Sequence, residues 1–217
     1  MTGFVIAVDG PAASGKGTVS AMLGRLYKYP VLDTGLLYRA VGVAVRIAGG
    51  DLDDAAQAAA AAAALNLEHL EDPALRTREA GECASRVAVH GAVRQALLDF
   101  QRRFAAREPG AVLDGRDIGT VIAPDAPAKL FVTASAEVRA ERRWLQLQVQ
   151  DPDITYEDVL ADIRRRDERD SGRAAAPLVK ADDAVLLDTS EMTIDQAADA
   201  ARRIVEAARG RWERSQG

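Results

Sequence analysis

The 217-residue sequence predicts an α/β fold in which a parallel sheet of five strands is covered by helices on both faces, as three layers. Two observations lead to this prediction. Short apolar runs alternate along the chain with segments of helical periodicity, and each run is apolar throughout rather than at every second position. A strand of this kind is typical of a parallel sheet, because helices pack on both of its faces.

Five short apolar segments are the predicted strands. Turn or capping residues bound each of them, and the first lies close to the N-terminus. The segments are residues 4–8, 31–32, 111–113, 129–132 and 184–187, of which 31–32 has the weakest pattern.

Helical patterns lie between these strands and after the last of them. Two of the predicted helices begin with the spacing of a capping box, Thr155 with Asp158 and Thr193 with Gln196. The patterns span residues 19–26, 37–44, 55–64, 89–104, 156–163 and 194–208, and 55–64 is alanine except at Gln57.

The longest connection between two predicted strands is residues 33–110, which contain two or three helices. A single crossover needs far fewer residues, so we expect an insertion over residues 50–95. Insertions at the strand ends of such sheets tend to form the binding face. The prediction is therefore one domain over residues 1–217 that carries a helical binding insertion.

Composition narrows the class of protein. The formal charge of −5 argues against a nucleic-acid partner, which normally requires a basic surplus. No apolar run approaches the roughly 20 residues that span a bilayer, and the N-terminal run lacks the basic flank of a signal peptide. One cysteine, Cys83, excludes an internal disulfide. We expect a cytoplasmic monomer that acts on small molecules and contacts no membrane.

The strongest functional signal is a glycine-rich loop between the first predicted strand and the first predicted helix. Its glycines let backbone N–H groups converge on phosphate oxygens, and Lys16 reaches the outer phosphates. The Thr18 hydroxyl is placed to help hold Mg²⁺, directly or through water. The pattern predicts a P-loop NTPase-type fold that binds a nucleoside triphosphate through Gly10, Pro11, Ala12, Ala13, Ser14, Gly15, Lys16, Gly17 and Thr18.

Several classes of P-loop protein are excluded. A GTPase needs an Asn-Lys-x-Asp motif, and the only asparagine, Asn66, is followed by Leu67. Large ATPases need a longer chain and a catalytic glutamate beside their acidic strand end. A small kinase remains, and a glycine after the loop lysine, here Gly17, is typical of nucleoside monophosphate kinases.

Residues 139–173 contain eight arginines and no lysine. Several of them recur at helical spacing, and two interpretations are open. They are either an exposed face with Glu137, Glu141, Asp162 and Glu168 as ion-pair partners, or a mobile lid over the triphosphate. Because the chain also has a P-loop, we favour a short lid over residues 142–173.

Together these features resemble bacterial cytidylate kinases. The resemblance runs in family order from residue 4 to about residue 190 and is carried by the joint order of the motifs. They are the loop at 10–18, Asp33-Thr34-Gly35 with Tyr38-Arg39, Ser85-Arg86-Val87-Ala88 with Val93-Arg94, Asp114-Gly115-Arg116-Asp117, and Arg166-Asp167-Glu168-Arg169-Asp170 with Arg173 and Ala176-Pro177-Leu178.

The resemblance implies that ATP is the phosphoryl donor and that Mg²⁺ is the cofactor. The loop at 10–18 would hold the phosphates of ATP, and Arg142 and Arg166, with Arg169 as a further candidate, would cover them as part of the lid. The residues that act in catalysis would be Lys16, Arg116, Arg142 and Arg173.

The resemblance also implies that the acceptor is CMP or dCMP. Its exocyclic amine needs a hydrogen-bond acceptor and its ring nitrogen and oxygen need donors, and Ser85, Arg94 and Asp117 would supply them. Asp170 would accept a hydrogen bond from the sugar, and arginines would hold the acceptor phosphate. The acceptor-binding residues would be Thr34, Arg39, Ser85, Arg94, Arg116, Asp117, Asp170 and Arg173.

Two features depart from the family pattern. The family often has Ser where Thr34 stands, which keeps the hydroxyl. The family's insertion usually contains a small antiparallel sheet, whereas residues 67–78 are too short for one and show no alternation. We therefore expect a trimmed frame around the acceptor site.

The expected chemistry is in-line phosphoryl transfer. The acceptor phosphate is mostly dianionic at neutral pH, since its second pKa is about 6, so no general base is needed. Neither histidine, His69 or His90, stands in a recognisable site. A kinase for another small acceptor, and a nucleotide-sensing or partner-binding module without turnover, are the alternatives.

Overall fold

A computed structural model describes residues 3–66, 70–149 and 151–216 of the chain. In these residues five parallel strands form one sheet in the order β2-β3-β1-β4-β5, as the apolar runs predicted. All carboxyl ends of the strands therefore point to one edge. The strands are β1 (Phe4–Asp9), β2 (Val31–Asp33), β3 (Gly110–Gly115), β4 (Ala128–Thr133) and β5 (Val185–Asp188).

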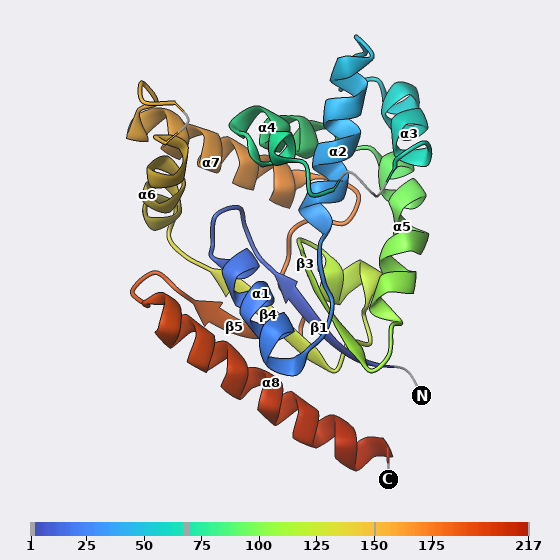
Figure 1. Cartoon of the computed structure of the whole chain (residues 1–217), viewed down its shortest axis with the longest axis vertical. Helices are drawn as coiled ribbons and strands as arrows, with labels where there is room; N and C mark the ends of the chain where they lie inside the picture. The colour runs from blue at the N-terminus through green and yellow to red at the C-terminus, as the bar shows by residue number, and fades with distance from the viewer. Residues whose placement is uncertain (1–2, 67–69, 150, 217) are drawn as a thin grey trace.

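Helices cover the two faces of the sheet (Figure 1). On one face α1 (Lys16–Tyr27) and α8 (Ile194–Gln216) bury alternate residues of β1, with Ile6 and Val8 at the centre of that core. The other face packs against α5 (Gly91–Ala105) and the short helical turn η3 (Ile118–Ile122). Both faces are thus apolar, which explains the continuous apolar runs.

The connection between β2 and β3 forms a helical module with a hydrophobic core of its own, above the sheet in Figure 1. It has four α-helices in the described residues, whereas the periodicity predicted two or three. The helix that was missed buries mainly small side chains, so it lacks the large apolar residues by which the other helices were recognised. The elements are α2 (Thr34–Ile47), α3 (Ala55–Ala63), the 3₁₀ turn η2 (Pro73–Arg76), α4 (Arg78–Val87) and α5.

Two boundaries in this module differ from the prediction. Val89 was assigned to a helix but lies in the turn before α5, which begins at Gly91 because His90 has the extended backbone of an N-cap. The described part of residues 67–78, from 70 on, contains η2 and the start of α4 and no strand, in agreement with the expected lack of an antiparallel sheet. Residues 67–69, including His69, lie outside the described residues.

A fourth hydrophobic cluster joins two helices to the P-loop. α6 (Ala136–Leu147) and α7 (Tyr156–Gly172) pack on each other and on Ala12. The predicted caps are present at both helix starts. Thr193 and Gln196 form the complete capping box, each bonding to the other's backbone. Thr155 Oγ1 accepts from Asp158 N at 3.1 Å, while the Asp158 carboxylate accepts from the Thr155 hydroxyl at 2.7 Å. The arginine-rich segment is therefore a helix pair that reaches the phosphate loop.

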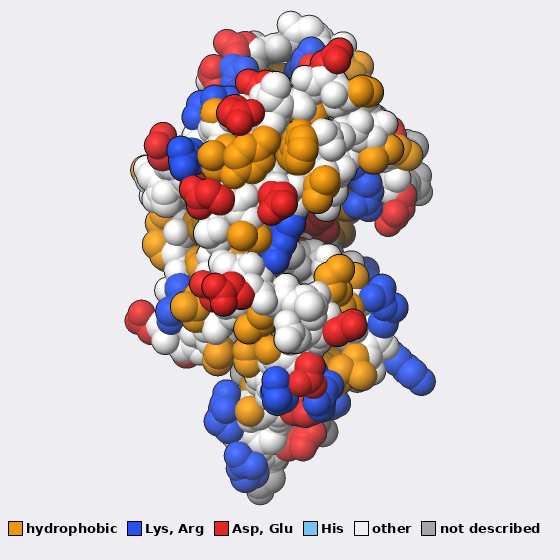
Figure 2. Space-filling model, turned by 90° about the vertical axis from the view of Figure 1, so that its left-hand side faces the viewer, with side chains coloured by type: hydrophobic (Ala, Val, Ile, Leu, Met, Phe, Trp, Pro, Cys, Tyr) orange, Lys and Arg blue, Asp and Glu red, His pale blue; other side chains and the backbone are white. Residues whose placement is uncertain are grey.

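On the face shown in Figure 2, Lys and Arg side chains are interspersed with Asp and Glu side chains. Ion pairs at the surface follow the same pattern, as between Arg202 and Glu206 at 2.8 Å. Of the helices in the described residues, none is both long enough and apolar enough to cross a bilayer.

Candidate active site

The P-loop connects β1 to α1 at the carboxyl edge of the sheet. Gly10 has φ of +151°, and a Cβ there would lie 1.9 Å from the carbonyl oxygen of Val132, so only glycine fits. Gly15 occupies the N-cap of α1, where no side chain of the described residues accepts a capping hydrogen bond from the first backbone N–H groups. These donors remain available for an anion.

A cavity of about 1160 Å³ lies beside this loop. Its walls come from the P-loop and from α2, α4, α6 and α7, elements far apart in the sequence. Of the predicted site residues, those that line it are Ala12, Ala13, Ser14, Gly15, Lys16, Gly17, Thr18, Arg39, Arg116, Arg142 and Arg166.

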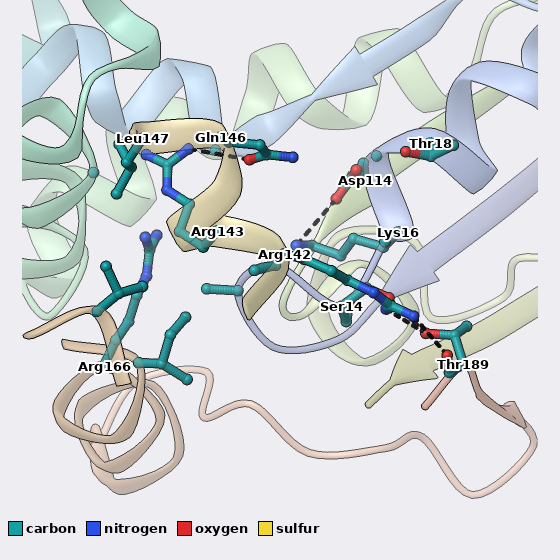
Figure 3. Close-up of a pocket in the computed structure, with 18 of the residues that line it drawn as sticks. Ser14, Lys16, Thr18, Asp114, Arg142, Arg143, Gln146, Leu147, Arg166 and Thr189 are labelled. Carbon is teal, nitrogen blue, oxygen red and sulfur yellow. Dashed lines mark hydrogen bonds and ion pairs between the residues drawn. The ribbon is translucent and has the colours of Figure 1, made fainter. Parts of the chain in front are cut away.

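Lys16 lines the cavity, and its ammonium group is 3.3 Å from the carbonyl oxygen of Pro11 and 3.8 Å from Asp114 Oδ1, as the dashed line to Asp114 in Figure 3 marks. Burial lowers the pKa of Lys16, and Arg116 lowers it further. Burial likewise raises the pKa of Asp114. Phosphate oxygens beside Lys16 would favour its charged form, because an opposite charge offsets the cost of desolvation.

Arg142 extends from α6 toward the P-loop, as Figure 3 shows. Its guanidinium donates to Thr189 Oγ1 at 3.0 Å and to the Thr189 carbonyl oxygen at 2.7 Å. The Thr189 hydroxyl in turn donates to the carbonyl oxygen of Ser14 at 3.0 Å. Arg142 is thus fixed beside the phosphate loop through a residue that follows β5.

Arg39 and Arg166 converge on α4 at Gly81. A Cβ at Gly81 would lie 3.3 Å from an Arg39 nitrogen and 3.4 Å from an Arg166 nitrogen, so glycine allows both guanidiniums to come close. Arg39 donates to the carbonyl oxygens of Leu75 and Thr77 at 2.7 and 3.1 Å. Burial lowers the pKa of each arginine to about 10, and both remain protonated at neutral pH.

A chain of buried ion pairs continues from the cavity wall into the helical module. Arg116 Nε contacts Asp170 Oδ2 at 3.0 Å, and Arg173 lies 4.0 Å from Asp170 and 3.9 Å from Asp117. Asp117 also accepts a hydrogen bond from Arg94. Five of the predicted acceptor-binding residues, on α5, α7 and the loop after β3, therefore meet at one place.

Charge balance holds this network together. Burial alone would raise the pKa of Asp170, but the nearby guanidiniums of Arg116, Arg166 and Arg173 outweigh it and hold that pKa below its usual value. Within the described residues, Arg173 Nη2 and Arg166 Nε are buried donors without a hydrogen-bond partner. Such donors suit the oxygens of an anionic ligand.

The two predicted hydroxyl residues of the acceptor site differ in their surroundings. The Ser85 hydroxyl, on α4, is buried and has no hydrogen-bond partner among the described residues. The Thr34 hydroxyl donates to the carbonyl oxygen of Asp114 at 2.8 Å, so only its oxygen lone pairs are left for a ligand.

Several cavity residues were not among the predicted ones. Asp114 is the last but one residue of β3, Thr189 follows the end of β5, and Arg143 projects from α6 beside Arg142. The first two could have been found from sequence, because polar residues at the carboxyl ends of parallel strands share one edge. Arg143 lies within the lid predicted over residues 142–173, but it was not named there as a site residue.

The arginine-rich segment divides between the two interpretations that the sequence left open. Arg164 pairs with Glu137 at the surface, as expected of an exposed face. Arg139, by contrast, is buried and donates to Asp167 and to the Ala12 carbonyl oxygen at 3.3 Å. The same helices therefore carry a solvated face and a face directed to the P-loop.

Comparison with known proteins agrees with this geometry. The model of the family described as Cytidylate kinase matches residues 6–207. The chain belongs to the cytidylate kinase family. It is therefore an enzyme of the nucleoside monophosphate kinase type rather than a binding module without turnover.

Individual relatives match over nearly their whole length. A protein named Cytidylate kinase from Caulobacter sp. (strain K31) is 67% identical over 214 residues, 99% of either chain. Another of that name from Xanthobacter autotrophicus (strain ATCC BAA-1158 / Py2) is 65% identical and covers 95% of this chain and 99% of its own.

A solved structure supports the fold alone. It is an uncharacterized protein from Eubacterium ventriosum ATCC 27560, 15% identical, with a TM-score of 0.54 over 94% of this chain and 98% of that one.

Proposed function

We propose that this cytidylate kinase family member transfers the γ-phosphoryl group of ATP to CMP or dCMP, giving ADP and CDP or dCDP. The observation that carries the proposal is one cavity that joins the P-loop to Arg39, Arg116 and Arg166. From Arg116 the buried ion pairs continue through Asp170 and Arg173 to Asp117. Donor and acceptor phosphates would meet within it.

The donor half is the P-loop with the arginines of α6 and α7. Backbone N–H groups at the start of α1 and the Lys16 ammonium would hold the phosphates of ATP. Arg142 and Arg166, from different helices, would neutralise charge on the transferred group.

The acceptor half would take the phosphate of CMP on Arg39, Arg116 and Arg173. The Nη2 of Arg173, which lies 3.9 Å from Asp117 and has no hydrogen-bond partner in the described structure, supports this assignment. Asp170, already oriented by Arg116, would accept a hydrogen bond from the sugar. Thr34, at the start of α2, would contribute its hydroxyl oxygen.

The base would be read at the inner end of the network. Asp117 is a carboxylate acceptor for the exocyclic amine of cytosine, and Arg94 and Ser85 are donors for its ring nitrogen and oxygen. Ser85 has a buried hydroxyl without a partner in the described structure, which fits a role toward a ligand.

Mg²⁺ fits the residues present. In the described chain no three His, Cys, Asp or Glu side chains come together as a metal site. This suits Mg²⁺, which binds largely through phosphate oxygens and water with one or two protein ligands. Thr18, which lines the cavity, would hold it through its hydroxyl. When bound, the ion would neutralise charge on the phosphates.

The chemistry requires positioning more than proton transfer. An oxygen of the dianionic acceptor phosphate attacks the γ-phosphorus in line, and the arginines and Lys16 align the two anions that would otherwise repel each other. We assign residues 50–95 to the acceptor module and 142–173 to a lid. Closure of the lid would exclude water and so prevent hydrolysis of ATP.

A coupled assay of ADP release, with ATP, Mg²⁺ and each of CMP, dCMP, UMP, AMP and GMP, tests the proposal. Turnover confined to CMP and dCMP is expected. Arg166→Ala should lower kcat at least 100-fold, as removal of one charge-stabilising donor does elsewhere, while Arg164→Ala, on the exposed face of the same helix, should not. Turnover with none of the five acceptors would refute the proposal.

A further inference from the structure

The turn that carries Asp117 is capped by a residue from another strand. η3 begins at Ile118, and Asp117 occupies its N-cap position. The first N–H groups of a helical turn have no partner within it, and an N-cap aspartate normally accepts from them. The side chain of Asp117 makes no such bond and contacts Arg94 and Arg173 instead.

Asp9 takes over the capping role from 109 residues earlier in the chain. Its Oδ1 accepts from Ile118 N at 2.7 Å and its Oδ2 from Gly119 N at 2.7 Å. The parallel pairing of β1 with β3 sets up this contact, since Asp9 lies opposite Gly115 at the carboxyl ends of both strands.

Placing a carboxylate there is costly. Asp9 is only 6% exposed, and burial raises its pKa to about 6, although the hydrogen bonds from the N–H groups of Ile118 and Gly119 lower it. Its neighbour Gly10 opens the P-loop. One side chain thus ties the backbone of the acceptor-reading turn to the first residue of the phosphate loop.

We propose that Asp9 is a positioning residue for acceptor recognition, which caps η3 in place of Asp117 and so leaves the Asp117 carboxylate directed at Arg94 and Arg173. This inference rests on the proposed function, in which Asp117 reads the cytosine amine. Without Asp9, the unpaired N–H groups of Ile118 and Gly119 would compete for the Asp117 carboxylate and turn it away from the base.

Asp9→Asn tests the proposal with almost no change of shape. The asparagine oxygen can accept from one N–H group, while its own NH₂ faces the other. The KM for CMP should rise about tenfold, the loss expected for one hydrogen bond to a charged group, and the CMP/UMP ratio of kcat/KM should fall by a similar factor. The KM for ATP should stay within about twofold, since one hydrogen bond to the acceptor turn touches no donor contact.

Val205→Ala is the matched control for lost stability. Val205 is fully buried between α8 and the sheet, away from the turn. The Val205→Ala substitution should lower the melting temperature without changing the KM for CMP or the CMP/UMP ratio of kcat/KM. If Asp9→Asn behaves in the same way, with a lower melting temperature and unchanged CMP kinetics, Asp9 is structural only and the proposal is overturned.

Two further measurements keep the outcomes separate. Amide hydrogen exchange on the unmodified enzyme should show Ile118 and Gly119 protected, and rapid exchange of both would overturn the proposal without any variant. Turnover of CMP by the unmodified enzyme is measured first. Its absence would refute the proposed function, and this inference with it, whereas CMP turnover that is unaffected by Asp9→Asn would refute the inference alone.

Discussion

Asp117 allows the sharpest test of base recognition, and the surrounding structure decides which variant to use. The Asp117 side chain is 7% exposed and contacts Arg94 and Arg173, whose side chains are 10% and 3% exposed. Asp117→Ala would leave two buried guanidiniums without their carboxylate. Breaking such a pair costs about 3–5 kcal/mol, a large part of a typical folding stability of about 5–15 kcal/mol. Asp117→Asn also removes the charge, but it keeps the shape and an oxygen that can still accept from Arg94, so it is the better choice.

The magnitude follows from the hydrogen bond that is lost. A bond from the cytosine amine to a carboxylate contributes about 1.5–3 kcal/mol, equivalent to roughly 10- to 150-fold in kcat/KM. An asparagine amide can also turn its NH₂ toward the O4 of UMP, which a carboxylate repels. We therefore expect Asp117→Asn to lower the CMP/UMP ratio of kcat/KM about 100-fold.

The assay is coupled ADP release with CMP and UMP at saturating ATP and Mg²⁺. The KM for ATP should remain within about twofold, because a hydrogen bond to the base makes no contact with the donor. Asp53→Asn is the control, since Asp53 is an exposed carboxylate that also pairs with an arginine, Arg86. Equal losses for CMP and UMP in Asp117→Asn would refute the assignment of Asp117 to the base.

Three other predictions concern the P-loop and its neighbours. Lys16→Ala should lower kcat by about 10³-fold or more with the fold intact by circular dichroism; a retained rate would remove Lys16 from the chemistry. Gly10→Ala should lower the melting temperature and abolish ATP binding by calorimetry, because its Cβ would overlap the Val132 carbonyl oxygen, and normal binding would contradict this. The pKa of Asp9, raised to about 6 from 3.8, means that the folded state keeps this proton to higher pH than the unfolded state. The Asp9 contribution to the free energy of unfolding should therefore fall by about 2 kcal/mol from pH 4 to pH 6, and the free energy of unfolding of Asp9→Asn, measured by urea titration, should lack this pH dependence.

The sequence was most informative where one local pattern suffices. Continuous apolar runs identified all five strands to within a residue or two, since burial on both faces leaves that mark in any parallel sheet. The P-loop was identified from the sequence equally well, because its function depends on backbone N–H groups of consecutive residues. Helix α4 was not predicted, because it packs through small side chains such as Ala80, Gly81 and Ala84 and not through large apolar residues.

The sequence predicted the acceptor site only in part. The resemblance proposed Arg94, Asp117 and Asp170 as members of one site, and the structure brings them into a single ion-pair network. Which of the eight arginines at 139–173 face the cavity could not be read from spacing. Arg164 and Arg166 are two residues apart, yet one pairs with Glu137 at the surface and the other is directed at Gly81.

By itself the sequence determined the sheet, its helical cover, the phosphate loop and the kinase class, because each depends on residues near one another in the chain. Tertiary structure alone decided the pairing of Asp9 with Ile118 and Gly119, and the link from Arg142 through Thr189 to the P-loop. These contacts join residues brought together by the order of strands in the sheet, and no local pattern encodes which distant donor meets which acceptor. The physical reason is that a hydrogen bond depends on separation in space, to which separation along the chain is no guide.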